Sequence, residues 1–198
     1  MEFYRRFFKY HKASTQTILF ILLFLLGFTS RFLPHPYNFS PISAIAIFSG
    51  FFFGWKKAFL LPIAMMFFSD LFLGFYQFNL MFTVYAALAI SAIAGFFLRK
   101  NFHWRKVIWI SFACSFFFFF TTNYAVWALT SWYEKSPSGL LACFLAALPF
   151  LRNTLLGDIF YTGSFFGIYS FLKTKRRIHI PSHFNVKNHE QSAFCLSK

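Results

Sequence analysis

The chain has 198 residues, of which 58% are hydrophobic and only 12% are charged. Its apolar runs reach the ~20 residues that cross a ~30 Å hydrocarbon core, which excludes a soluble fold and predicts an all-α integral membrane protein. The formal net charge of +14 lies in residues that flank the apolar runs, so the expected partner is the lipid bilayer and not nucleic acid. The three cysteines show neither a CxxC pair nor metal-ligand spacing, so no metal and no cofactor is expected.

Six membrane-spanning helices are predicted in chain order. Residues 1–15 form a basic cytoplasmic leader, and the first span, at about 16–33, is expected to be retained because no small-residue cleavage site ends it. The later spans are expected at about 41–54, 58–74, 80–98, 107–129 and 150–172. Pro149 divides the last apolar block, so a short or re-entrant helix is expected to end near 148. The spans make one six-helix bundle of residues 16–172, and the basic tail 173–198 is expected to lack order.

The positions of the basic residues predict the orientation of this bundle. All lysines and arginines except Arg31, Lys135 and Arg152 fall on the same side of the six spans as the N-terminus. Basic residues are enriched in cytoplasmic loops, so both termini are expected in the cytoplasm.

Residues 31–41, named here the proline loop, join the first two spans. Pro34, Pro36 and Pro41 forbid a regular helix over this stretch and predict a stiff, shaped connection. The loop also carries groups suited to recognition, namely Arg31, His35, Tyr37 and Asn38. The alternative interpretation is that Arg31 marks a membrane edge and the prolines only make a turn.

Polar and ionisable residues gather in the outer half of the predicted bundle. An ionisable residue within a span is unfavourable and is expected to face the bundle interior and find a partner. One hypothesis is an outward-open pocket for a polar small molecule, walled by aromatic rings that include Tyr76. Its other predicted residues, beside those of the proline loop, are Asp70, Asn123, Tyr124, Trp127, Arg152, Asn153 and Asp158. The alternative is that cross-helix pairs, such as Arg31 with Asp70, only fasten helices together.

Small residues recur at four-residue intervals in the second span, at Ala46, Gly50 and Gly54. Such a ridge lets another helix approach closely within a membrane. It is interpreted either as packing within the chain or as the face that contacts a partner subunit.

Catalytic motifs are absent from the sequence. It contains no HExxH, GxSxG, GxxxxGK[ST] or GxGxxG, so zinc or serine hydrolysis and nucleotide binding lack their usual groups. The protein is therefore not expected to be an enzyme, and a proton-coupled carrier that uses Asp70 or Asp158 stays open as a further alternative.

Four ordered blocks carry a resemblance to a known family. They are RFLPHPYNFSP at 31–41, MMFFSDLFLGF at 65–75, TNYAVW at 122–127 and ALPFLRNTLLGD at 147–158. Together they resemble the signature blocks of an uncharacterised bacterial membrane family. That family is itself similar to the substrate-binding S components of energy-coupling-factor (ECF) vitamin transporters.

The resemblance implies a six-helix, S-component-like fold in the bacterial inner membrane. Such a protein would capture a vitamin or other micronutrient from outside, and its first outer loop, here the proline loop, would help to close the site. A transmembrane coupling subunit with two ATPases would supply the energy, and the ridge of Ala46, Gly50 and Gly54 would contact that subunit. The alternative in a different class is a structural or assembly protein of the inner membrane, in which the polar cluster serves helix packing only.

Overall fold

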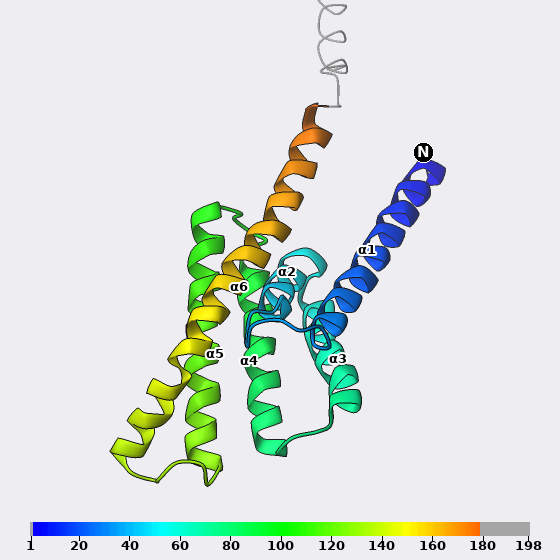
Figure 1. Cartoon of the computed structure of the whole chain (residues 1–198). Coiled ribbons are helices and arrows are strands. Elements are labelled where there is room, and N and C mark those ends of the chain that lie inside the picture. The colour runs from blue at the N-terminus through cyan, green and yellow to red at the C-terminus, as the bar shows by residue number, and fades with distance from the viewer. Residues whose placement is uncertain (1, 179–198) are drawn as a thin grey trace, which may run out of the picture. The chain divides into compact units, whose positions relative to one another are not determined.

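The computed structural model describes residues 2–178, and it describes side chains for residues 15–54 and 57–174. All the elements in this part of the chain are helices: α1 (Glu2–Ser30), α2 (Ile42–Phe53), α3 (Trp55–Leu73), α4 (Phe78–Phe97), α5 (Trp104–Leu129) and α6 (Pro137–Ile178) (Figure 1). The predicted all-α class is confirmed. The chain divides into a unit of residues Met1–Phe165 and a second unit, Phe166–Lys198, whose described part is the continuation of α6.

Three helical stretches are long and apolar enough to cross a membrane: Phe78–Phe97, Trp104–Leu129 and Pro137–Thr174. The apolar stretches Thr15–Ser30 and Ile42–Phe53 are shorter. The outer faces of the helices carry large exposed apolar side chains, among them Leu22, Phe72, Phe82 and Trp109. Exposed apolar surface of this extent suits contact with lipid.

The short helix α2 lies at the centre of the first unit. Every residue from Ala44 to Phe51 is buried, and α2 contacts α1, α3, α4 and α5. Figure 1 shows α2 beside α3 and α4, and shows α4 and α5 side by side in opposite directions. With 12 residues, α2 extends for only about 18 Å, and its neighbours bury all of it except the two residues at each end.

Glycines set the closest approach of α2 to α4. A Cβ atom at Gly50 would collide with the carbonyl oxygen of Ala92, and one at Gly95 would collide with that of Ile47. Gly54 is the one-residue link to α3, has φ 82°, and lies against the guanidinium of Arg99. Ala46, Gly50 and Gly54 are therefore buried, and the two glycines lie against α4 and the α4–α5 link of the same chain.

The expected break at Pro149 is wrong, because α6 runs through this residue without interruption. Proline removes only one donor, the bond to the carbonyl four residues earlier, and the rest of a long helix keeps its ladder. The helix α3 likewise contains Pro62. At 42 residues α6 is about 63 Å long, roughly twice the hydrocarbon thickness, so only part of it lies within a membrane.

The links between helices at the two ends of the bundle differ in charge. The α2–α3 link at Gly54 lies against Arg99 of the α4–α5 link, so these two links share one end of the bundle, together with Lys100. At the other end, Gln77 of the α3–α4 link donates a hydrogen bond of 3.0 Å to the carbonyl of Leu129 at the end of α5. The end with Arg99 and Lys100 is the more basic of the two.

Candidate functional site

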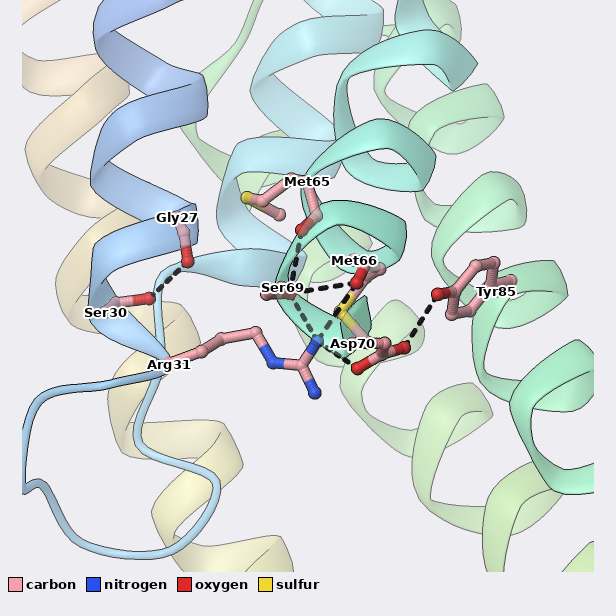
Figure 2. A network of polar contacts seen from close by, with 8 residues as sticks. All are labelled: Gly27, Ser30, Arg31, Met65, Met66, Ser69, Asp70 and Tyr85. Carbon is pink, nitrogen blue, oxygen red and sulfur yellow. Dashed lines mark hydrogen bonds and ion pairs between the residues drawn. The ribbon is translucent and has the colours of Figure 1, made fainter. Parts of the chain in front are cut away.

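The Arg31 network lies where the proline loop leaves α1 (Figure 2). Arg31 Nη1 lies 2.5 Å from Asp70 Oδ1, 2.5 Å from Ser69 Oγ and 3.3 Å from the carbonyl oxygen of Met66. The other carboxylate oxygen of Asp70 accepts a hydrogen bond of 2.7 Å from the hydroxyl of Tyr85 on α4. The pairing of Arg31 with Asp70 that the sequence suggested is present, and it joins α1 to α3.

Every polar side chain of this network has a hydrogen-bond partner. Ser69 donates to the carbonyls of Met65 and Met66 at 2.8 and 2.9 Å, and it accepts from Arg31, which is a pure donor. Asp70 is 1% exposed and Arg31 is 17% exposed. A buried carboxylate is thus matched by one full cation and a hydroxyl donor, which is what an ion pair needs to offset its loss of water.

Tyr76 lies in the link between α3 and α4, close to this network. Burial and, to a smaller extent, the charge of Asp70 raise the pKa of its hydroxyl to about 12, although Arg31 opposes the shift. Tyr76 therefore stays neutral at physiological pH.

A second polar group, the Asp158 cluster, lies between α5, α6 and the first turn of α2. It consists of Ser43, Ser111, Ser115, Asp158 and Thr162. Ser115 Oγ lies 2.5 Å from Asp158 Oδ2, the Ser43 side chain also hydrogen-bonds to this carboxyl, and the hydroxyls of Ser111 and Thr162 lie 3.4 Å apart. Asp158 is 2% exposed, and within the described residues no ion pair involves it.

The proline loop packs on the first part of α6. The side-chain amide of Asn153 donates a hydrogen bond of 3.0 Å to the carbonyl of Tyr37, whose ring meets Phe150 edge to face. Gly157 brings the backbone close, since a Cβ there would lie 3.3 Å from Phe39 Cα. Within the loop, His35 Nδ1 donates to the carbonyl of Leu33 at 2.7 Å.

Asn38 has a φ of 63° and is the one residue other than glycine with a positive φ within residues 2–178. An asparagine tolerates this left-handed conformation better than most residues. The loop can therefore turn here between its prolines and reach α6.

A third group closes the link between α5 and α6. Trp127 Nε1 donates to the carbonyl of Glu134 at 2.9 Å, and Lys135 donates to the carbonyls of Trp127 and Thr130. The rings of Tyr124 and Trp127 lie 5.7 Å apart. These contacts satisfy backbone groups that the end of a helix leaves without partners.

The remaining predicted residues are placed separately. The amide of Asn123 donates to the carbonyl of Phe119 on its own helix at 2.7 Å, and its own carbonyl lies 3.5 Å from the thiol of Cys143. Arg152 is exposed. The structure thus distributes the predicted binding residues over the Arg31 network, the Asp158 cluster, the proline loop and the α5–α6 link.

Two open apolar hollows occur on the described surface. One, of about 170 Å³, lies between α4 and α5 and is lined by Phe82, Thr83, Ala86, Ala87, Ile90, Phe117 and Thr121. The other, of about 330 Å³, is lined by the rings of Phe24, Phe28, Phe68 and Phe72 on α1 and α3. Neither hollow is lined by a residue that the sequence assigned to the polar pocket.

Sequence reasoning missed Ser69 and Tyr85 in the first network and Ser43 and Ser115 in the second. The position of Ser69 next to Asp70 in the sequence could have predicted that Ser69 belongs to the Arg31 network. Nothing in the periodicity of α4 distinguishes Tyr85, and only the packing of α3 against α4 brings its hydroxyl to Asp70.

The model of a family described as "Family of unknown function (DUF6580)" matches residues 11–182. The chain belongs to this family. No curated protein and no solved structure matches it. The segment that matches the DUF6580 model contains the proline loop, the Arg31 network and the Asp158 cluster.

Proposed function

We propose that this protein crosses the bacterial inner membrane six times, with both termini in the cytoplasm, and acts as the substrate-binding subunit of a small-molecule importer. Its substrate would be a vitamin or other micronutrient taken from the outer side. A separate module, a transmembrane coupling subunit with two ATPases, would supply the energy. The proposal assigns no catalysis, metal or cofactor to this chain.

The observation that carries the proposal is the placement of the proline loop. Arg31 ties the start of the loop to α3, and the bond from Asn153 to the carbonyl of Tyr37 ties its middle to α6. A loop anchored at its start and packed at its middle on α6 is suited to close an outer site, because its middle can part from α6, with loss of the Asn153 bond and the Tyr37–Phe150 contact, while Arg31 keeps its start in place.

The distribution of charge supports the orientation. The α4–α5 link, which carries Arg99 and Lys100, shares one end of the bundle with the α2–α3 turn, whereas the α3–α4 link carries no lysine or arginine. Basic residues favour the cytoplasmic side, so the proline loop and the α3–α4 link would face outward.

A second candidate is a structural or assembly role in the membrane. It is favoured by the completeness of the hydrogen bonding, since every buried polar side-chain atom within the described residues has a partner. In this interpretation the Arg31 network and the Asp158 cluster only fix the packing of helices.

Native mass spectrometry of the full chain, purified in mild detergent from cells grown in rich medium, separates the two candidates. The importer predicts a bound small molecule in the wild type that is lost in Asn153→Ala. The matched control is Gln77→Ala, which also removes one amide-to-carbonyl bond of 3.0 Å from a link and should retain the molecule. Two results together would exclude the importer. The folded wild type would carry no bound molecule, and deleting the protein from cells would leave micronutrient uptake unchanged.

A further inference from the structure

The two buried aspartates of this bundle have different surroundings. Asp70 has a full cation, Arg31, at 2.5 Å, together with the hydroxyl of Tyr85. Asp158 is buried to a similar degree, but within the described residues its partners are the hydroxyls of Ser115 and Ser43. A buried carboxylate without a cation is strongly disfavoured, so Asp158 requires a different means of neutralising its charge.

The hydrogen bonds of Ser69 show how a serine in this protein can donate to its own helix and accept from an ionisable side chain. Its hydroxyl has one hydrogen, which it gives to the carbonyls of the preceding turn of α3. Its oxygen then accepts from Arg31 at 2.5 Å. Ser69 thus uses both its donor and its acceptor capacity. In its contact with Arg31, the hydrogen comes from Arg31.

Ser115 has the same arrangement beside Asp158. Its oxygen lies 2.9 Å from the carbonyl of Ser111 in the preceding turn and 2.5 Å from Asp158 Oδ2. Two adjacent carbonyls of one turn, as at Ser69, can share one hydroxyl hydrogen, but the two acceptors at Ser115 lie on different helices, α5 and α6, so its single hydrogen is directed at one of them. If Ser115 donates to Ser111, as Ser69 donates to its own helix, the contact of 2.5 Å needs a second hydrogen, and the Asp158 carboxyl is the group that can carry it.

The other groups around Asp158 do not supply a positive charge. Cys114 on α5, whose thiol is bonded to Ser91, carries no positive charge, the proline loop contributes Phe39 and Ser40 beside the adjacent Gly157, and the rest of the cluster consists of hydroxyls. Ser43 brings the N-terminal end of α2, but a helix end acts as only about half a unit charge and is weaker than a cation in contact. Arg152, on the same helix, is exposed.

We propose that Asp158 is a proton-binding site of the bundle, at which the protonated carboxyl donates to Ser115 Oγ and Ser115 donates to the carbonyl of Ser111. On release, the carboxyl O–H bond breaks, the proton passes to water, and the carboxylate is left between α5 and α6. Such a charge is stable only if water or a cation enters, so release of the proton is coupled to opening of the contact between these two helices. A substrate-binding subunit does not require this site, which therefore stands independently of the proposed function.

Infrared spectroscopy of the full chain in lipid nanodiscs at neutral pH tests the site. A protonated carboxyl has a C=O stretching band that is separate from the bands of carboxylates. The wild type is expected to show this band, Asp158→Asn is expected to lose it, and Asp70→Asn is expected to keep it, because Asp70 is ionised beside Arg31. The variant Ser115→Ala is expected to keep the band at a shifted frequency, since the carboxyl loses its acceptor.

Several results would overturn the proposal. They are a wild type without the band, a band that survives Asp158→Asn, and a band that appears only when sodium chloride is replaced by choline chloride, which would indicate a bound sodium ion. If Asp158→Asn does not fold, the Ser115→Ala spectrum decides: an unshifted band means that Asp158 is not its source.

Discussion

Replacing Arg31 by glutamine tests whether the Arg31 network holds the first unit together. The substitution removes the cation from a carboxylate that is 1% exposed and leaves it only the hydroxyl of Tyr85. Removing one partner of a buried ion pair costs about 3–5 kcal/mol, because the other charge stays buried without compensation. Arg31 itself is 17% exposed, so water reaches the pair and the lower end, about 3 kcal/mol, is expected.

The reverse change should cost less. In Asp70→Asn the charge left behind is Arg31, which lies at the end of α1, is partly exposed and can extend its long side chain toward water. The double variant Arg31→Gln with Asp70→Asn carries no buried charge, so it should be no less stable than Asp70→Asn. The order of stability is therefore wild type, then Asp70→Asn and the double variant, then Arg31→Gln.

Equilibrium unfolding of the purified variants in mixed detergent micelles measures this order. Tyr85→Phe is the matched control, since it removes one hydrogen bond to Asp70 but no charge, at a cost of about 1.5–3 kcal/mol. Two results would refute the reasoning. One is a double variant whose loss of stability equals the sum of the losses of the two single variants. The other is a stability of Arg31→Gln within about 0.5 kcal/mol of the wild type, since surface substitutions already produce changes of that size.

Three further predictions concern glycine packing, a helix proline and a tyrosine. Gly50→Ala should destabilise by about 1–3 kcal/mol, because the added Cβ collides with the Ala92 carbonyl, whereas Gly163→Ala, with open space around it, should be neutral or stabilising in the same unfolding assay. Pro149→Ala should stabilise by about 1 kcal/mol, since it restores one backbone donor to a continuous helix, and a loss of stability would speak for a break there. For Tyr76, whose folded pKa is about 12, the stability from the neutral form is present below pH 10 and lost as the pH rises toward about 12. Alkaline unfolding should therefore be shallower in Tyr76→Phe than in the wild type.

Composition and hydropathy were sufficient to predict the helical class and the presence of helices long and apolar enough to cross a membrane, because a long apolar run satisfies its backbone within itself as a helix. The prediction of a stiff loop at residues 31–41 rested on three prolines, whose effect is local, and the structure has no helix there. The break at Pro149 was predicted by the same local reasoning and is wrong, since the many other bonds of α6 outweigh one missing donor.

The candidate site shows where local reasoning ends. Charge and depth in the spans were sufficient to pair Arg31 with Asp70, because a buried charge has to find its opposite and few were available. The same reasoning placed Asp158 in one pocket with Asp70, whereas the structure surrounds it with hydroxyls from α2 and α5. Serines are common and carry no periodic signal, so their convergence on one carboxyl is visible only in three dimensions.

The sequence by itself determined that this chain is helical, with helices long and apolar enough to cross a membrane, since these properties follow from transfer energies summed along the chain. Only the tertiary structure decided that α2 is buried by its neighbours, that Gly50 and Gly95 serve contacts inside the chain, and that the two aspartates differ. These outcomes depend on which helix faces meet. That choice is made by close contacts between residues far apart in the sequence, and no single segment contains it.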